Sequence, residues 1–132
     1  MAFHSSQRIA ELAVDAGSKK ASMRPEQALL LGFLGGAFIA LGFLLDIRVI
    51  ANLPKEWGTF SSLLGGAVFP VGLMLIIIAG GELLTGNMMA LPIAVLAKRA
   101  TPGQLVRNWL LVLVSNFIGP SSSLISLVIY LD

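Results

Sequence analysis

An octapeptide of polar and flexible residues, Gly80–Asn87, holds the side chains that are best placed to do chemistry. Glu82 within it is the only charged residue between Trp57 and Ala97, a stretch of 41 residues that is otherwise apolar or neutral. A carboxylate, a hydroxyl, an amide and three glycines therefore lie inside a segment that is otherwise apolar enough to cross a membrane. Irregular polar backbone at that depth is tolerated only where it is buried in protein or lines a water-filled path. We interpret the octapeptide as a break in a transmembrane helix that forms a solute pathway.

The composition of the chain is that of a membrane protein. Hydrophobic residues make up 56% of the sequence, charged residues 12%, and the mean hydropathy is +0.87. Crossing the hydrocarbon core of a bilayer takes about 20 helical residues. Three charge-free runs meet this length, and none shows the alternation of a strand: residues 27–45, 57–81 and 108–131. The predicted fold class is an all-α membrane protein.

Other function classes find little support in the residues. Cysteine is absent, the single histidine (His4) lies in the polar tail, and the acids are scattered. No paired carboxylates, nucleophile–base set or metal-ligand cluster can be assembled from them, so we expect no enzyme, no metal site and no cofactor. The basic residues are divided between loops without aromatic interleaving, which gives no indication of nucleic acid binding.

The sequence predicts a short N-terminal segment, residues 1–24, followed by a transmembrane domain, residues 25–132. Apolar residues at Ile9, Leu12, Ala13 and Ala16 have helical spacing and give one modest apolar face. We expect this helix to end near residues 17–18. It either lies against the membrane or a neighbouring subunit, or plugs a pore from below.

The positions of lysine and arginine predict the topology. Four lie in the N-terminal tail, two in residues 46–56 and three in residues 98–107. Because short loops rich in these residues stay in the cytoplasm, the tail and the second loop belong on the cytoplasmic side. The stretch between Trp57 and Ala97 must then cross once. A continuous helix of that length would measure about 61 Å, twice what one crossing needs.

The predicted spans are therefore residues 26–50, residues 58–98 with an interruption at 80–87, and residues 102–131. An alternative places the octapeptide outside the membrane and makes residues 88–97 a second crossing. Only 15 uncharged residues would serve that crossing, and the basic loop would lie outside. Pro25 and Thr101 are expected at helix starts, and Gly32 and Gly36 as a pair that permits close helix packing.

A set of motifs resembles the formate/nitrite transporter family over residues 24–119. It consists of Glu82–Asn87, preceded by Phe69 and Leu73 and followed by Gln104-Leu105, Asn108-Trp109 and Asn116. The resemblance implies a pentameric channel of the bacterial inner membrane for small monovalent anions such as formate or nitrite. It also implies an aquaporin-like subunit of six spans, built from two inverted three-span repeats.

The resemblance also implies roles along a substrate pathway. Thr85 matches the threonine whose hydroxyl faces the pore. Leu83 and Leu84 match the hydrophobic constriction on the cytoplasmic side, and Phe69 and Leu73 match the constriction on the outer side.

The remaining residues of the octapeptide are expected to shape its backbone. Glu82 should form hydrogen bonds with backbone amides, because a free carboxylate facing the path would repel anions. Gly80, Gly81, Gly86 and Asn87 are grouped with it as loop-structuring residues.

The chain departs from the family pattern in two ways. The central histidine and the entrance lysine of the family belong to a second repeat, which this sequence does not contain, and Pro120 followed by three serines replaces a small apolar stretch. We therefore expect the chain to represent the first repeat of a formate or nitrite channel in the inner membrane, with a cytoplasmic N-terminus. The alternative is a transport-inactive truncated fragment or an accessory membrane subunit.

Overall fold

The residues described by the computed structural model, 3–131 with side chains as far as residue 125, form helices and connecting turns. In chain order the elements are α1 (Ser6–Ala21), α2 (Pro25–Ala51), the 3-10 turn η1 (Lys55–Trp57), α3 (Thr59–Val68), α4 (Pro70–Ala79), α5 (Leu84–Leu96) and α6 (Pro102–Leu131). Three stretches are long and apolar enough to cross a membrane: Pro25–Ala51, Thr59–Ala79 and Pro102–Ile125. The predicted all-α membrane fold with three spans is confirmed.

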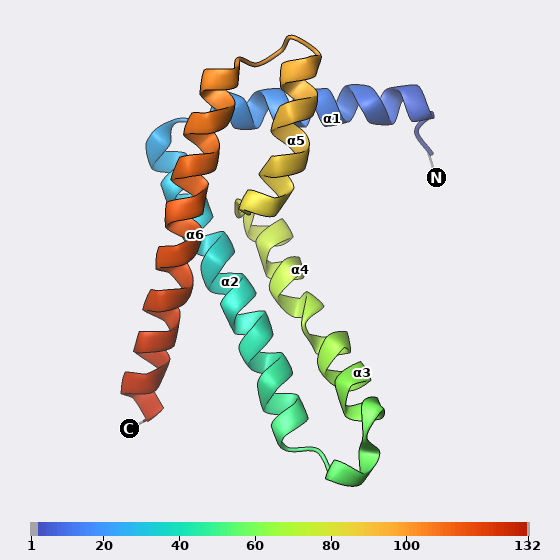
Figure 1. The fold of residues 1–132 in the computed structure, drawn as a ribbon, viewed down its shortest axis with the longest axis vertical. Coiled ribbons are helices and arrows are strands. Elements are labelled where there is room, and N and C mark those ends of the chain that lie inside the picture. Colours follow the sequence, from blue (N-terminus) through green and yellow to red (C-terminus); the bar gives the residue numbers. More distant parts are fainter. Residues whose placement is uncertain (1–2, 132) are drawn as a thin grey trace.

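The second crossing is made by three helices in succession. Figure 1 shows α3, α4 and α5 following one another along the length of the molecule, with α5 bent relative to α4 but running on toward the same end. Helix α6 then returns along α2, and α1 lies across the end where α5 and α6 are joined. This arrangement confirms the broken second span and is inconsistent with α5 as a separate return crossing.

The helix starts follow from local sequence. Pro25 occupies the first position of α2, where its missing N–H costs nothing. At the start of α6, the Thr101 N–H donates to Gln104 Oε1 (2.8 Å) and the Gln104 N–H donates to Thr101 Oγ1 (3.2 Å). This reciprocal pair satisfies two amides that would otherwise lack partners.

Helix α1 continues past the point where the sequence suggested an end. It runs through Gly17 to Ala21 rather than ending at residues 17–18. Gly17 is buried, and a Cβ on it would collide with the carbonyl oxygen of Ala90 in α5. The glycine therefore serves close helix packing at this position and does not terminate the helix.

Helix α2 is the centre of the fold because its glycines face both neighbouring spans. On one face, Gly32 packs against Ser115 of α6, and a Cβ on Gly36 would lie 2.5 Å from the Asn116 carbonyl oxygen. On another face, Gly42 lies against Gly72 of α4. The predicted small-residue pair in α2 is confirmed as the contact with α6, where it lets the two backbones approach closely.

Helix α6 remains helical through Pro120. Proline cannot donate the usual hydrogen bond to the carbonyl four residues earlier, which is that of Asn116. That carbonyl lies against Gly36, and the hydroxyls of the three following serines donate to carbonyls of the preceding turn. The contact with α2 therefore covers the place where the helix lacks a bond.

Replacing Gly36 with alanine should destabilise the fold. The added methyl group would overlap the backbone of α6, and overpacking of this kind typically costs about 1–3 kcal/mol. Gly66→Ala is the matched control, since a Cβ on that α3 glycine meets nothing within 4 Å. Thermal unfolding in detergent, followed by circular dichroism, should show a lower midpoint for Gly36→Ala alone. Equal midpoints for the two variants would contradict the close α2–α6 packing.

Candidate functional site

The interruption of the second span is shorter than the sequence suggested. Helix α4 ends with Gly80 in the left-handed conformation (φ 69°), and the Gly81 N–H donates to the Ile76 carbonyl (2.8 Å). The chain is helical again from Leu84. The non-helical part is thus Gly80–Leu83, and the expected interruption over residues 80–87 was too long. Thr85, Gly86 and Asn87 belong to the first turn of α5.

Asn116 of α6 holds the interruption in place. Its Nδ2 donates to the carbonyl oxygens of Gly32 (2.7 Å) and Glu82 (2.9 Å), and its Oδ1 accepts from the Leu84 N–H (2.9 Å). The Glu82 N–H in turn donates to the Leu31 carbonyl of α2 (2.9 Å). One amide side chain therefore links α2, α5 and α6 around a short stretch of backbone that has lost its own helical partners.

The carboxylate of Glu82 is paired with a cation and not with backbone amides. The Glu82 residue is buried, 6% exposed, and both its oxygens accept from Lys20 Nζ at 2.6 Å. The expected hydrogen bonds to backbone amides are thus replaced by a contact with α1, 62 residues away in the sequence. A buried charge at membrane depth must be paired, and the ammonium group satisfies this requirement directly.

A chain of amides continues from the same lysine. Asn108 Nδ2 donates to the Lys20 carbonyl (3.0 Å), and Asn87 Nδ2 donates to Asn108 Oδ1 (2.8 Å). Trp109 Nε1 donates to the Asn87 carbonyl (3.3 Å). Asn87 is fully buried, and its Oδ1 has no hydrogen-bond partner among the described residues. These contacts fix the first turn of α5 against α6 and the end of α1.

The predicted pathway residues fall into two groups at opposite ends of α4. Leu83 and Leu84 are half-buried beside the interruption, and Thr85 is exposed next to them. Phe69 lies at the other end of α4, half-buried, with Leu73 exposed one turn further along. Ten residues of helix separate the groups by roughly 15 Å. The structure thus brings Leu83, Leu84 and Thr85 together but keeps them apart from Phe69.

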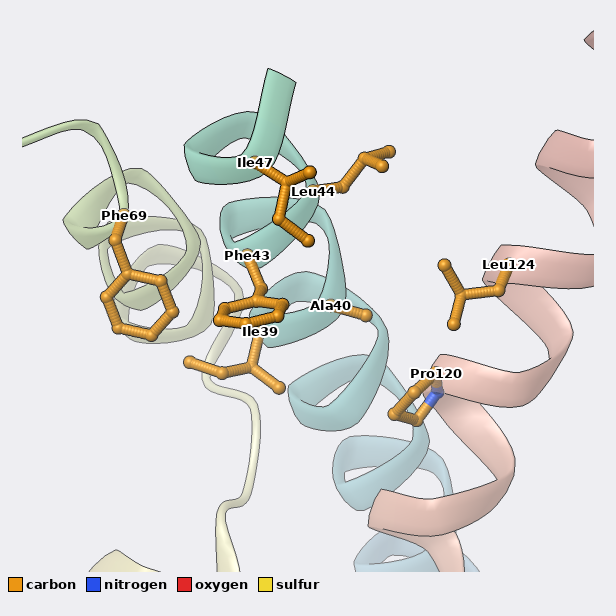
Figure 2. Close-up of a pocket in the computed structure, with 8 residues that line it drawn as sticks. All are labelled: Ile39, Ala40, Phe43, Leu44, Ile47, Phe69, Pro120 and Leu124. Atoms are coloured by element: carbon orange, nitrogen blue, oxygen red, sulfur yellow. The ribbon is translucent and has the colours of Figure 1, made fainter. Parts of the chain in front are cut away.

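Phe69 belongs to an apolar groove between α2 and α6 in the half of the molecule away from α1. Its ring meets that of Phe43 edge to face, with centroids 6.5 Å apart. Figure 2 shows both rings at the side of this groove, with Pro120 on the opposite wall. The groove encloses about 520 Å³ and is lined by Ile39, Ala40, Phe43, Leu44, Ile47, Phe69, Pro120 and Leu124.

A second groove begins at the interruption. It encloses about 410 Å³, and its lining combines apolar side chains with the polar Asn116 and Ser121; the full set is Leu84, Leu113, Asn116, Phe117, Pro120, Ser121 and Leu124. Pro120 and Leu124 line both grooves. Thr85, Leu83 and Leu73 line neither of them.

Sequence reasoning missed Lys20 and the role of Asn116. A signal for both was present, because a lone carboxylate and a lone amide in apolar spans each require a polar partner. Four cations of the N-terminal tail were equally eligible to pair with Glu82, so the sequence could not select one. Among the residues with described side chains, no three acidic or histidine side chains meet as a possible metal site.

Comparison with known proteins places these features in a family. A family model described as "Formate/nitrite transporter" matches residues 7–131. The chain is 56% identical over 119 residues to "Formate channel BtFdhC" of Bacillus thuringiensis, which covers 90% of the chain and 46% of that protein. The same identity and 90% of the chain are found with "Uncharacterized transporter YrhG" of Bacillus subtilis, covering 45% of that protein.

A more distant relative carries the same kind of name. "Formate channel FocA" of Escherichia coli K12 is 32% identical over 111 residues, which cover 84% of the chain and 39% of that protein. The chain thus spans less than half the length of these relatives, and no solved structure matches it. Since the family model covers nearly the whole chain, the chain belongs to the formate/nitrite transporter family.

Proposed function

We propose that the chain supplies the first three spans of a six-span subunit that carries formate or nitrite across the bacterial inner membrane. The relatives named as formate channels support a transport function and formate as the substrate. In this proposal the chain works by conducting an anion and not by catalysis. The observation that carries the proposal is the start of a helix, α5, in the middle of a membrane crossing.

The first turn of α5 offers donors to an anion. The amides of a first helical turn lack intrahelical partners, and aligned peptide dipoles place about half a positive charge there. The Leu84 N–H donates to Asn116 Oδ1, whereas the N–H groups of Thr85 and Gly86 and the Thr85 hydroxyl form no hydrogen bond among the described residues. Interrupted helices in transporters present such ends to anionic substrates.

The Lys20–Glu82 pair makes this position tolerable for an anion. An unpaired carboxylate two residues before α5 would repel formate, whereas the ion pair adds no net charge. In the proposed path, Leu83 and Leu84 form the constriction nearer α1, and Phe69 and Leu73 form the other. Both narrow points are apolar, so the anion loses hydration there and relies on the donors between them.

The topology and assembly of the proposed subunit follow from charge and length. The excess of Lys and Arg at the end that holds α1 and the α5–α6 loop supports a cytoplasmic N-terminus. Large apolar side chains on the spans are exposed, for example Ile77 (77%) and Ile78 (83%). In the proposed subunit, these apolar surfaces would contact lipid, the second three-span repeat and neighbouring subunits of a pentamer.

A transport-inactive fragment or accessory membrane subunit is the second candidate. The observation that favours it is the exposure of Thr85, which no other described residue of the chain encloses in a pathway. Formate influx into proteoliposomes separates the two candidates when this chain replaces the matching part of the Bacillus thuringiensis relative. Influx above that of empty vesicles supports the first candidate, and its absence from an inserted chimera supports the second.

Thr85→Val should reduce formate flux, while Thr85→Ser should retain it. Valine keeps the shape of threonine but removes the hydroxyl, and a hydrogen bond to a charged group contributes about 1.5–3 kcal/mol. The expected loss is roughly 10–100-fold in rate. The measurement is formate influx by a chimera in which this chain replaces the matching part of the Bacillus thuringiensis relative.

Thr59→Val provides the matched control, because Thr59 is also an exposed threonine but begins α3 at the opposite end of the second crossing. It should leave influx unchanged. Wild-type influx through Thr85→Val would remove Thr85 from the pathway.

Lys20→Met should strongly destabilise the chain by leaving Glu82 buried without its cation. Breaking a buried ion pair in this way costs about 3–5 kcal/mol, whereas replacing both charges with apolar residues is often close to neutral. The double variant Lys20→Met/Glu82→Met should therefore recover most of the stability. Denaturant unfolding in detergent micelles measures both changes.

Lys19→Met tests whether the effect belongs to the ion pair. Lys19 is adjacent in the sequence and exposed, and it has no carboxylate partner among the described residues. Its replacement should leave the unfolding free energy within about 0.5 kcal/mol of wild type. The ion-pair argument fails if Lys20→Met is as mild as Lys19→Met.

A further inference from the structure

The N-terminal part of α1 is largely uncovered by the other residues that the structure describes. Gly17 packs against Ala90 and Ala94 of α5, and the helix ends at the Lys20 contacts described above. Every residue from His4 to Leu12 is exposed, in contrast. Figure 1 shows this part of α1 projecting beyond α5, across the direction of the spans. A 16-residue helix is about 24 Å long, so a substantial part of α1 is uncovered.

Contacts at the C-terminal half show which way each face of α1 points. Ser18 Oγ donates to the Arg99 carbonyl (3.3 Å), and Asp15 pairs with the Arg99 side chain (3.6 Å). These residues face the α5–α6 loop. The Lys20 side chain reaches instead to Glu82, inside the second crossing. The helix therefore has one face toward the loop and another toward the level of the spans.

The apolar residues of α1 lie on the face that points toward the spans. Ile9, Ala13 and Ala16 precede Lys20 by 11, 7 and 4 residues, and these spacings place them on one helical face with it. Leu12 lies at the edge of the same face. Ile9 is 57% exposed and Leu12 39% exposed, although both lie on the side of α1 from which Lys20 reaches the second crossing. We call Ile9, Leu12, Ala13 and Ala16 the apolar stripe of α1.

Basic side chains border the same stripe. Arg8 and Lys19 lie 4 residues before and 7 residues after Leu12, so they follow its outer edge. Arg8 contacts Glu11 at the surface (2.9 Å), and Lys19 has no carboxylate within 4 Å in the described part of the chain. An apolar face with cations along its edge matches the boundary between the acyl chains and the anionic headgroups of a membrane.

We propose that the uncovered part of α1 is an interfacial anchor that binds a lipid surface, with Ile9 and Leu12 among the acyl chains and Lys19 at headgroup phosphates. A second copy of the chain fits this stripe less well. Stable protein interfaces bury about 800 Å² on each partner. The stripe contains only two large side chains, Ile9 and Leu12, and two alanines, which is a small area for such an interface. This inference is independent of the proposed transport function, because it concerns the surface of α1 outside the pathway.

Spin labels on single cysteines test the anchor, since the chain contains no native cysteine. Ile9→Cys and Leu12→Cys place the label on the apolar stripe, and Gln7→Cys and Glu11→Cys place it on the opposite face as matched controls. The full chain is reconstituted in vesicles of phosphatidylethanolamine and phosphatidylglycerol. Accessibility to oxygen, which enters the acyl region, is compared with accessibility to a water-soluble nickel chelate. The labels at 9 and 12 should favour oxygen several-fold more than those at 7 and 11.

Two outcomes would overturn the proposal. Equal access of the nickel chelate to all four labels would mean that α1 projects into water. Low access of both reagents at residues 9 and 12, with spectral broadening that disappears on dilution with unlabelled chain, would mean that a second copy covers the stripe.

Charge reversal at Lys19 tests the headgroup contact separately. Lys19→Glu should make the label at residue 12 shallower in vesicles that contain phosphatidylglycerol and leave it unchanged in zwitterionic vesicles. Lys55→Glu, in the turn at the opposite end of α2, is the control and should have no effect on that label. An unchanged depth in Lys19→Glu would show that anionic headgroups do not hold α1.

Discussion

The ion pair between Glu82 and Lys20 is the interaction on which the arrangement of the chain depends. An ionised carboxylate inside an apolar crossing is costly unless a cation and further hydrogen bonds reach it. Lys20 meets this need only if the end of α1 lies beside the second crossing. Because the carbonyl of the same residue accepts from Asn108, that position of α1 also orients α6. One residue outside the spans therefore connects α1, the interruption and α6.

The interruption persists because its polar backbone is satisfied by neighbouring helices. The Gly80 and Gly81 amides donate to the last turn of α4, and Asn116 bonds the Glu82 carbonyl and the Leu84 amide on either side of Leu83. The close approach this requires is possible at Gly35, where a Cβ would overlap the Glu82 carbonyl. A small residue in α2 and an amide in α6 thus replace the water that exposed backbone would otherwise need.

Local and periodic features of the fold were predictable, and contacts distant in sequence were not. The spans, the start of α2 at Pro25 and the break in the second crossing followed from hydropathy, proline chemistry and the distribution of Lys and Arg. The length of the break did not, because Asn116 caps Leu84 from 32 residues away and lets the helix resume early. Likewise the need for a partner of Glu82 could be read from the sequence, whereas the choice of Lys20 depends on how α1 packs through Gly17.

The two helix ends at the interruption are not electrically equivalent. The carbonyls that end α4 carry partial negative charge, but the Gly80 and Gly81 amides bind two of them. At the start of α5, the amides of Thr85 and Gly86 remain without partners among the described residues, and Lys20 cancels the charge of Glu82. The positive end of α5 is therefore the less compensated of the two. In the proposed pathway, a solute at Thr85 would meet the unpaired N–H groups of Thr85 and Gly86, which would favour an anion over a cation at this position.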